Sequence, residues 1–318
     1  MTAAVAFFAV RAAQALKSIG SAQLYASAQA ARRVYDEVAT ITGLPLEVLL
    51  DGEIGAYPQR RHDILIVRTI ALHIAIAETL AAQGVRPDLI AGLSVGLSSA
   101  AYLTGCLTLA QAVGLHWGDR FGADAVPASA ATCWMSPDMD PGEFCAATDF
   151  GVHPVMDFGL APNGTGHLVI LAGAPADVRR LADARLLPKL VVHPDTRASH
   201  TPLHAAVAER VRRHLAGIVM ADPAVPITDG LRPGALTTGP QVAESIWRNQ
   251  SHPLRAELAL AEIGARGTGL CLSLGPTQVD QLLRFPCPVL RLAGPDDIAE
   301  AVSRARELRD EVGVSGPQ

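Results

Sequence analysis

The chain has 318 residues, of which 49% are hydrophobic, so we expect one large domain with a smaller inserted or appended one. A net charge of −5 and an aromatic content of only 4% argue against a nucleic-acid-binding surface. Five scattered cysteines without a CxxC pair argue against a disulfide framework or a zinc knuckle, and they fit a reducing cytoplasm.

The first part of the chain alternates buried strands with helices. The expected elements, in chain order, are a strand at 5–10, helical spacing over 13–41, a short helix ending at Gly52, a long buried helix at 60–84, a strand at 87–94, a helix from about Val95 and a helix capped by Thr108. The chain shows neither a signal peptide nor an uninterrupted apolar stretch of about 18 residues, so we expect a soluble protein outside the membrane.

From residue 123 Gly, Pro, Ser and Asp separate short pieces, typical of a small α+β insertion. Strands are expected at 166–173 and 187–193, with a helix between them. After His200 the expected elements are helices at 202–216, 240–250 and 252–267, strands in "AVPITDG" and "GLCLSLG", and an amphipathic terminal helix from Asp296.

Residues 92–96, Gly-Leu-Ser-Val-Gly, form a G-x-S-x-G pentapeptide between a predicted strand and a predicted helix. A serine on such a turn sits in a sharp bend that presents its hydroxyl, as a nucleophile requires. A small residue demanded by a tight turn is the structural alternative for Ser94.

In the order of its features the chain resembles the malonyl-CoA:acyl carrier protein transacylase family, which includes the acyltransferase domains of polyketide synthases. The shared features are the first strand and helix, the G-x-S-x-G turn, the insertion, a histidine about a hundred residues after the serine, and "LGP" at 274–276. The resemblance implies an α/β fold: an α/β-hydrolase-like large subdomain with a parallel sheet (1–123 and 196–318) and an inserted ferredoxin-like small subdomain (124–195).

The resemblance makes Ser94 the nucleophile and His200, which ends the segment "TRASH", the general base, because polyketide synthase domains carry YASH there. His193 and His204 are competitors for the second role. In the family a backbone carbonyl orients the imidazole, and the matching position is near Asn249. His200 and His204 are four residues apart, as two metal ligands can be, but without a third ligand we expect no metal.

The family's PGQGSQ motif is missing, and residues 9–14, Ala-Val-Arg-Ala-Ala-Gln, stand in its place. The resemblance implies an oxyanion hole built from the backbone N–H groups of Arg11 and Val95, which the side-chain changes leave present. The lost glycines remove backbone freedom there. Losing one such donor costs on the order of 100-fold in turnover.

Malonyl-specific members clamp the malonyl carboxylate with an arginine, and here that position falls on Asp119. Arg120 follows it, about 100° further around the helix, and is the alternative candidate for the clamp if the alignment slips locally by one residue. A carboxylate at this place repels malonate, so we expect a non-malonyl acyl group. Arg197 stands at the position of the tyrosine or histidine that opens the family's specificity motif. His62 lies at the position where, in the family, a glutamine-bearing helix begins. Arg197 is expected to pair with Asp119, to bind an acid group of the substrate, or to lie on the surface.

We therefore expect an acyltransferase of polyketide or fatty-acid-type biosynthesis, which moves an acyl group from a coenzyme A or carrier protein thioester to a carrier protein through acyl-Ser94. An acyl carrier protein hydrolase with the same residues, a non-catalytic docking relative, and, more weakly, a patatin-type lipase using the aspartate of "TDG" (228–230) are the alternatives. The phosphopantetheine arm is the expected substrate arm, without a permanently bound cofactor. Arginine clusters at 60–61, 179–180 and 210–213 are candidates for receiving an acidic carrier protein.

Overall fold

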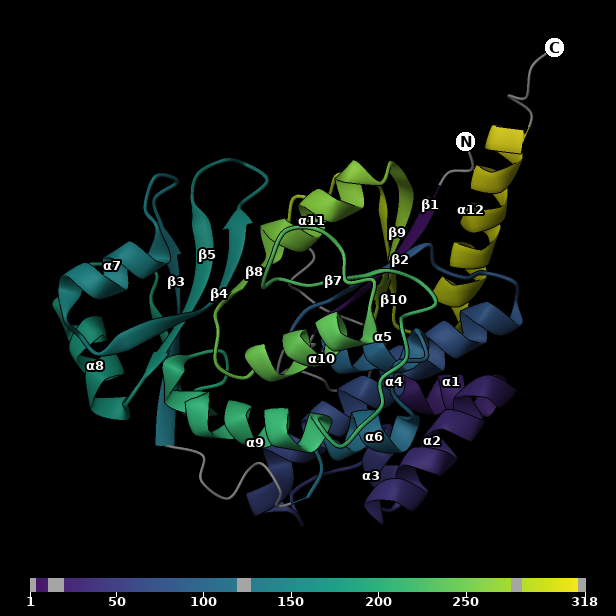
Figure 1. Ribbon diagram of the computed structural model, residues 1–318, viewed down its shortest axis with the longest axis horizontal. Coiled ribbons are helices and arrows are strands. Elements are labelled where there is room, and N and C mark those ends of the chain that lie inside the picture. The colour runs from purple at the N-terminus through teal and green to yellow at the C-terminus, as the bar shows by residue number, and fades with distance from the viewer. Residues whose placement is uncertain (1–3, 11–19, 119–126, 276–281, 314–318) are drawn as a thin grey trace.

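The structure, a computed structural model, describes residues 4–10, 20–118, 127–275 and 282–313. Two five-stranded sheets lie side by side, with helices packed around the larger sheet and against the outer side of the smaller one (Figure 1). The predicted α/β class with a large and a small part is confirmed.

The larger sheet is entirely parallel. Its strands, in spatial order, are β10 (Val289–Leu292), β9 (Thr268–Leu274), β1 (Ala4–Ala9), β2 (Leu89–Gly92) and β7 (Ile227–Thr228). Phe7 of β1 packs into one buried cluster and Phe8 into another on the opposite face of the sheet. Both faces are therefore covered, which explains why β1 is an uninterrupted apolar run.

Helices cover both faces of this sheet. They are α1 (Ser21–Ser27), α2 (Gln29–Thr42), α3 (Leu46–Leu50), α4 (Arg61–Ala82), α5 (Gly96–Leu103), α6 (Leu109–Gly114), α9 (Ala205–Leu215), α10 (Gly239–Arg248), α11 (Ala256–Ala265) and α12 (Pro295–Gly313), with short 3-10 turns at Pro58–Arg60 and Pro202–His204. Among the described residues one helix, Pro58–Ala82, is long and apolar enough to cross a membrane, but 78% of its apolar window is buried in the protein. Its neighbours in the core account for its composition.

In the smaller sheet, the first four strands in spatial order pair antiparallel with one another. The spatial order is β6 (Val191–Arg197), β3 (Pro127–Met135), β5 (His167–Gly173), β4 (Val152–Leu160) and β8 (Leu254–Arg255), and α7 (Pro141–Thr148) and α8 (Pro175–Ala184) belong to the same part of the chain. β6 runs to Arg197, and β8 joins β4 in parallel from a segment of the predicted large part. The division at 124–195 itself stays a prediction.

Three expected elements are wrong in detail. The helical spacing expected over 13–41 lies outside the described residues up to residue 19, and it is interrupted at Ala28, whose extended backbone separates α1 from α2. The strand expected at 187–193 begins only at Val191, because Lys189 has a left-handed backbone (φ 53°). The helix expected from His252 begins at Ala256, since Pro253 disfavours a helical conformation in the residue before it.

Candidate active site

Ser94 lies in the turn between β2 and α5, at the edge of the parallel sheet where β1 and β2 both end. Its backbone is left-handed (φ 55°), a strained conformation for a residue with a side chain. Leu93 N donates to Ala9 O at 2.9 Å, which ties the turn to the end of β1. The bend expected of a G-x-S-x-G turn is therefore present.

The two glycines of the motif allow this turn to pack. A Cβ on Gly92 would lie 2.8 Å from Gly96 O and from Leu97 Cα. A Cβ on Gly96 would lie 1.9 Å from Ala9 O. Strand and helix thus approach each other more closely than any side chain permits, and Ser94 is held between them.

His200 contacts Ser94 although 106 residues separate them: its Nε2 lies 2.9 Å from Ser94 Oγ. His200 Nδ1 donates to the backbone carbonyl oxygen of Asn249. With the proton on Nδ1, Nε2 is an acceptor, so the Ser94 hydroxyl donates to it. The backbone is left-handed here too (φ 66°), and His200 N donates to Gln250 O at 2.8 Å. The imidazole is held at both ring nitrogens, and the backbone is held by the third hydrogen bond, which is the geometry of a base beside its nucleophile.

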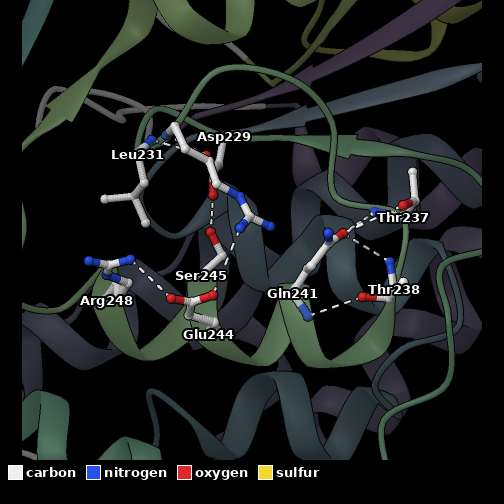
Figure 2. A network of polar contacts seen from close by, with 9 residues as sticks. Asp229, Leu231, Thr237, Thr238, Gln241, Glu244, Ser245 and Arg248 are labelled. Carbon is white, nitrogen blue, oxygen red and sulfur yellow. Dashed lines mark hydrogen bonds and ion pairs between the residues drawn. The ribbon is translucent and has the colours of Figure 1, made fainter.

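Asn249 follows directly on α10, whose first turn is fixed by a capping box between Thr238 and Gln241 (Figure 2). Besides its carbonyl contact with His200, its side-chain Nδ2 donates to the backbone oxygen of Ser94 at 3.2 Å. One buried residue therefore touches both members of the pair. The sequence pointed to the carbonyl, but nothing in it indicated the amide contact.

Val95 is the N-cap residue of α5, where backbone N–H groups lack intrahelical partners. This position suits a donor to an oxyanion formed at Ser94. The second expected donor, Arg11, lies outside the described residues, as do Asp119 and Arg120. Their expected roles stay predictions.

Arg197, the last residue of β6, forms an ion pair with Asp63 on α4: Nη2 and Oδ1 lie 2.8 Å apart. Their side chains are 27% and 13% exposed. Of the three possibilities expected for Arg197, none named Asp63 as its partner. His62, the neighbour of Asp63, is partly buried in the first turn of α4.

Two further imidazoles lie within electrostatic reach of Arg197. His116, whose role the sequence did not suggest, has its Nε2 2.8 Å from Ser98 Oγ on α5. Burial and, second, the charge of Arg197 lower the pKa of His116. Burial, Arg197 and Arg210 lower the pKa of His204 to about 4, and no described residue bonds to either ring nitrogen of His204. Both imidazoles are neutral at pH 7.

Two other residues considered for catalysis, His193 and Asp229, form their hydrogen bonds with groups other than Ser94 and His200. His193 lies on β6 with its Nε2 2.9 Å from Thr132 Oγ1 on β3. Asp229, the aspartate of "TDG", accepts hydrogen bonds from Ser245 Oγ and from the N–H groups of Leu231 and Arg232. The described parts of the chain hold no group of three His, Cys, Asp or Glu side chains suited to a metal ion.

Several arginines of the predicted basic clusters have partners within the protein. Arg60 lies over the ring of Trp117, 4.6 Å from its centroid. Arg180 pairs with Asp177 at 3.2 Å. Glu209 accepts from Arg212 at 2.7 Å and lies 3.7 Å from Arg213. Docking of a carrier protein at these clusters stays a prediction.

No family model matches the chain. Among curated proteins, polyketide synthase GfsA of Streptomyces halstedii is 28% identical over 251 residues, covering 74% of this chain and 3% of that protein. The malonyl CoA-acyl carrier protein transacylase of Bacillus subtilis is 24% identical over 303 residues, covering 91% of this chain and 93% of that protein. The chain thus spans a small fraction of the synthase and nearly all of the transacylase.

Solved structures agree on the fold. The malonyl-CoA:acyl carrier protein transacylase of Helicobacter pylori has a TM-score of 0.82 at 18% identity, covering 96% of this chain and 99% of that one. A malonyl-transacylase solved in complex with its type II polyketide synthase acyl-carrier protein has a TM-score of 0.81 at 19% identity, covering 94% and 99%.

Proposed function

Because the chain is a divergent member of the family of malonyl-CoA:acyl carrier protein transacylases and polyketide synthase acyltransferases, we propose that it transfers an acyl group to a carrier protein through an acyl-Ser94 intermediate. The observation that carries the proposal is the 2.9 Å contact between Ser94 Oγ and His200 Nε2, with Nδ1 bonded to the Asn249 carbonyl. This chain of hydrogen bonds aligns a hydroxyl, a base and an orienting acceptor.

The reaction has two halves. Ser94 Oγ attacks the thioester carbonyl while its proton passes to His200 Nε2, and the tetrahedral oxyanion is stabilised by backbone N–H groups, Val95 among them. The carbon–sulfur bond breaks, and the thiolate takes the proton from His200. In the second half His200 takes the proton of a carrier thiol, the thiolate attacks the acyl ester, and Ser94 recovers its proton.

The acyl group is proposed to lack a free carboxylate. Arg197 stands at the position that opens the family's specificity motif, and its charge is paired with Asp63 at 2.8 Å. His116 and His204 add no charge at pH 7, because burial lowers the pKa of each. A malonyl carboxylate would have to compete with Asp63 for Arg197, whereas an uncharged acyl group would not.

A carrier protein is proposed as the acceptor, with its phosphopantetheine arm or that of coenzyme A carrying the acyl group, in the cytoplasm. Support comes from the relatives: one solved neighbour is a transacylase bound to an acyl-carrier protein. The chemistry asks for no resident cofactor, because the serine, the imidazole and the backbone supply the nucleophile, the base and the oxyanion donors.

The test is a panel of acyl-CoA donors, malonyl included, with a carrier protein as acceptor. We expect acylated carrier with an uncharged acyl donor and none with Ser94→Ala. Release of free acid irrespective of acceptor would instead assign a hydrolase, and failure of every donor would favour a docking relative.

A matched variant tests the acyl class. Asp63→Asn removes the competing carboxylate but keeps Arg197, so the ratio of malonyl to uncharged acyl use should rise about tenfold, the weight of one charged hydrogen bond. Asp63→Asn together with Arg197→Gln should lose this gain. An unchanged ratio in Asp63→Asn would contradict the placement of Arg197 beside the acyl group.

A further inference from the structure

A basic groove lies beside the supports of Ser94 and His200. It is lined by residues of the loop after β7, the last turns of α10 and the segment leading into β8, among them Arg232, Glu244, Arg248, His252 and Arg255. These arginines come from three different segments between residues 232 and 255, and none belongs to the clusters predicted to be basic. Only the fold brings them together.

The groove is connected to the active site through its own walls. Arg248 directly precedes Asn249, the residue that contacts both Ser94 and His200. On the other wall Arg255 N donates to Gly230 O at 2.8 Å, and a Cβ on Gly230 would lie 3.1 Å from Leu93 Cδ2. The groove therefore adjoins Asn249, which contacts both catalytic candidates, and Gly230, which lies next to Leu93.

Its loop is held rigidly. Buried Asp229 accepts from Ser245 Oγ on α10 and from the backbone N–H groups of Leu231 and Arg232, at 3.0 and 3.3 Å (Figure 2). Burial raises the pKa of Asp229, while these backbone donors favour its charged form. The backbone of Arg232 is consequently held in place by Asp229.

The positive charge of the groove is not fully used inside the protein. Glu244 is the carboxylate of the lining, and it pairs with Arg248 (Figure 2). It lies 3.0 Å from Arg248 Nη1 and 3.8 Å from Arg232 Nη1. Arg255 pairs with Glu257 outside the lining. Arg232 Nη2 is buried without a hydrogen-bond partner among the described residues. A buried donor of this kind is costly unless an acceptor reaches it.

We propose that this groove binds the phosphate ester of the phosphopantetheine arm, with Arg232 and Arg248 as its ligands. Guanidinium groups bind phosphate oxygens through paired N–H donors, and Arg232 holds one such donor unused. The assignment rests on the proposed function, because a thioester on this arm is the substrate it requires. Coenzyme A and holo-carrier protein share this phosphate.

The test compares 4′-phosphopantetheine with pantetheine by calorimetry at low salt, in the Ser94→Ala protein so that no chemistry intervenes. We expect 4′-phosphopantetheine to bind at least about tenfold more tightly, the effect of one hydrogen bond to a charged group. Arg232→Gln and Arg248→Gln should each reduce this preference, while Arg304→Gln, an ion-paired arginine on α12, should keep it.

A variant that is expected to bind more tightly separates a specific effect on the groove from misfolding. Glu244→Gln removes the carboxylate that competes for the arginines, so 4′-phosphopantetheine should bind more tightly than to the parent. Coenzyme A and holo-carrier protein, measured in the same series, identify the donor: weakening of either by Arg232→Gln supports the groove.

Equal binding of the two compounds, no binding of either, or equal losses in Arg232→Gln and Arg304→Gln would overturn the proposal. The outcomes separate from those of the proposed function. An acyl-Ser94 adduct without a phosphate preference overturns the groove alone, and a phosphate preference without any adduct overturns acyl transfer alone.

Discussion

Replacing Gly96 by alanine should damage both stability and the reactivity of Ser94. The added Cβ would lie 1.9 Å from Ala9 O and 2.5 Å from Ala9 C, so it must retreat by more than 1 Å to reach the 3.0 Å that real Cβ contacts show. β1 cannot yield, since it pairs with β2 on one side and β9 on the other. The start of α5 has to move instead.

The size of the effect follows from that displacement. Overpacking of this kind costs about 1–3 kcal/mol of unfolding free energy. A misplacement of about 1 Å at a reacting group can cost about 100-fold in rate. The matched control is Gly114→Ala at the end of α6, where nothing lies within 4 Å of the new carbon. This control should be neutral or stabilising by up to about 1 kcal/mol.

Two assays read the outcome: urea unfolding, and the rate at which a fluorophosphonate labels Ser94, which needs no knowledge of the acyl group. Gly96→Ala should be less stable and label about 100-fold more slowly, with Gly114→Ala close to the parent. Equal stability and labelling in all three proteins would refute the close-packing account of this turn.

Two other predictions concern the pH response and the supporting amide. His73 and His204 are buried with pKa values of about 4, below the ordinary value of about 6.5 that applies on unfolding. The unfolded chain therefore binds more protons than the folded one between about pH 4 and 6.5. The unfolding free energy should therefore fall as the pH drops from about 6.5 towards 4, by up to about 1.4 kcal/mol per pH unit and histidine. His204→Met should reduce the slope of denaturation midpoints against pH, and an unaltered slope would contradict the shift. Asn249→Ala keeps the backbone carbonyl that holds His200 but removes the side-chain amide bonded to Ser94 O. Labelling of Ser94 should therefore slow about tenfold, and the unfolding free energy should fall by about 0.5–1.5 kcal/mol. Labelling at the parent rate would show that the amide is dispensable.

The fold was predictable where local signals and burial agree. The apolar run at 5–10 became β1, and the long apolar stretch at 60–84 became α4. Thr108, predicted as an N-cap, caps α6 with a capping box to Gln111. Errors occurred where one residue changes the backbone against the surrounding pattern, as Lys189 does before β6 and Pro253 before α11.

The small sheet was harder to predict because part of it is non-local. β4 and β8 pair across about a hundred residues, and β8 is only two residues long, so no periodicity marks it. Pro194 lies within β6, where proline weakens a strand signal. The sheet accepts it because β6 is an edge strand, with β3 as its one neighbour in the described sheet.

The site, like the fold, contains residues that the sequence predicted and residues that it did not. The spacing of a motif and a resemblance were enough to bring Ser94, His200 and the carbonyl of Asn249 into consideration together. The ion pair of Arg197 with Asp63 was not predictable, because charges 134 residues apart in sequence meet only where the fold brings the end of β6 next to the start of α4. The same reasoning applies to the groove arginines, each of which is unremarkable in its own segment.

The most direct test of the account is intact-mass analysis of the protein after incubation with a series of acyl thioesters. The account predicts a mass increase of one acyl group located on Ser94, absent from Ser94→Ala, strongly reduced in His200→Ala, and lost again when a carrier thiol is added. An acyl group found on another residue, or an equal adduct in the Ser94→Ala protein, would contradict it.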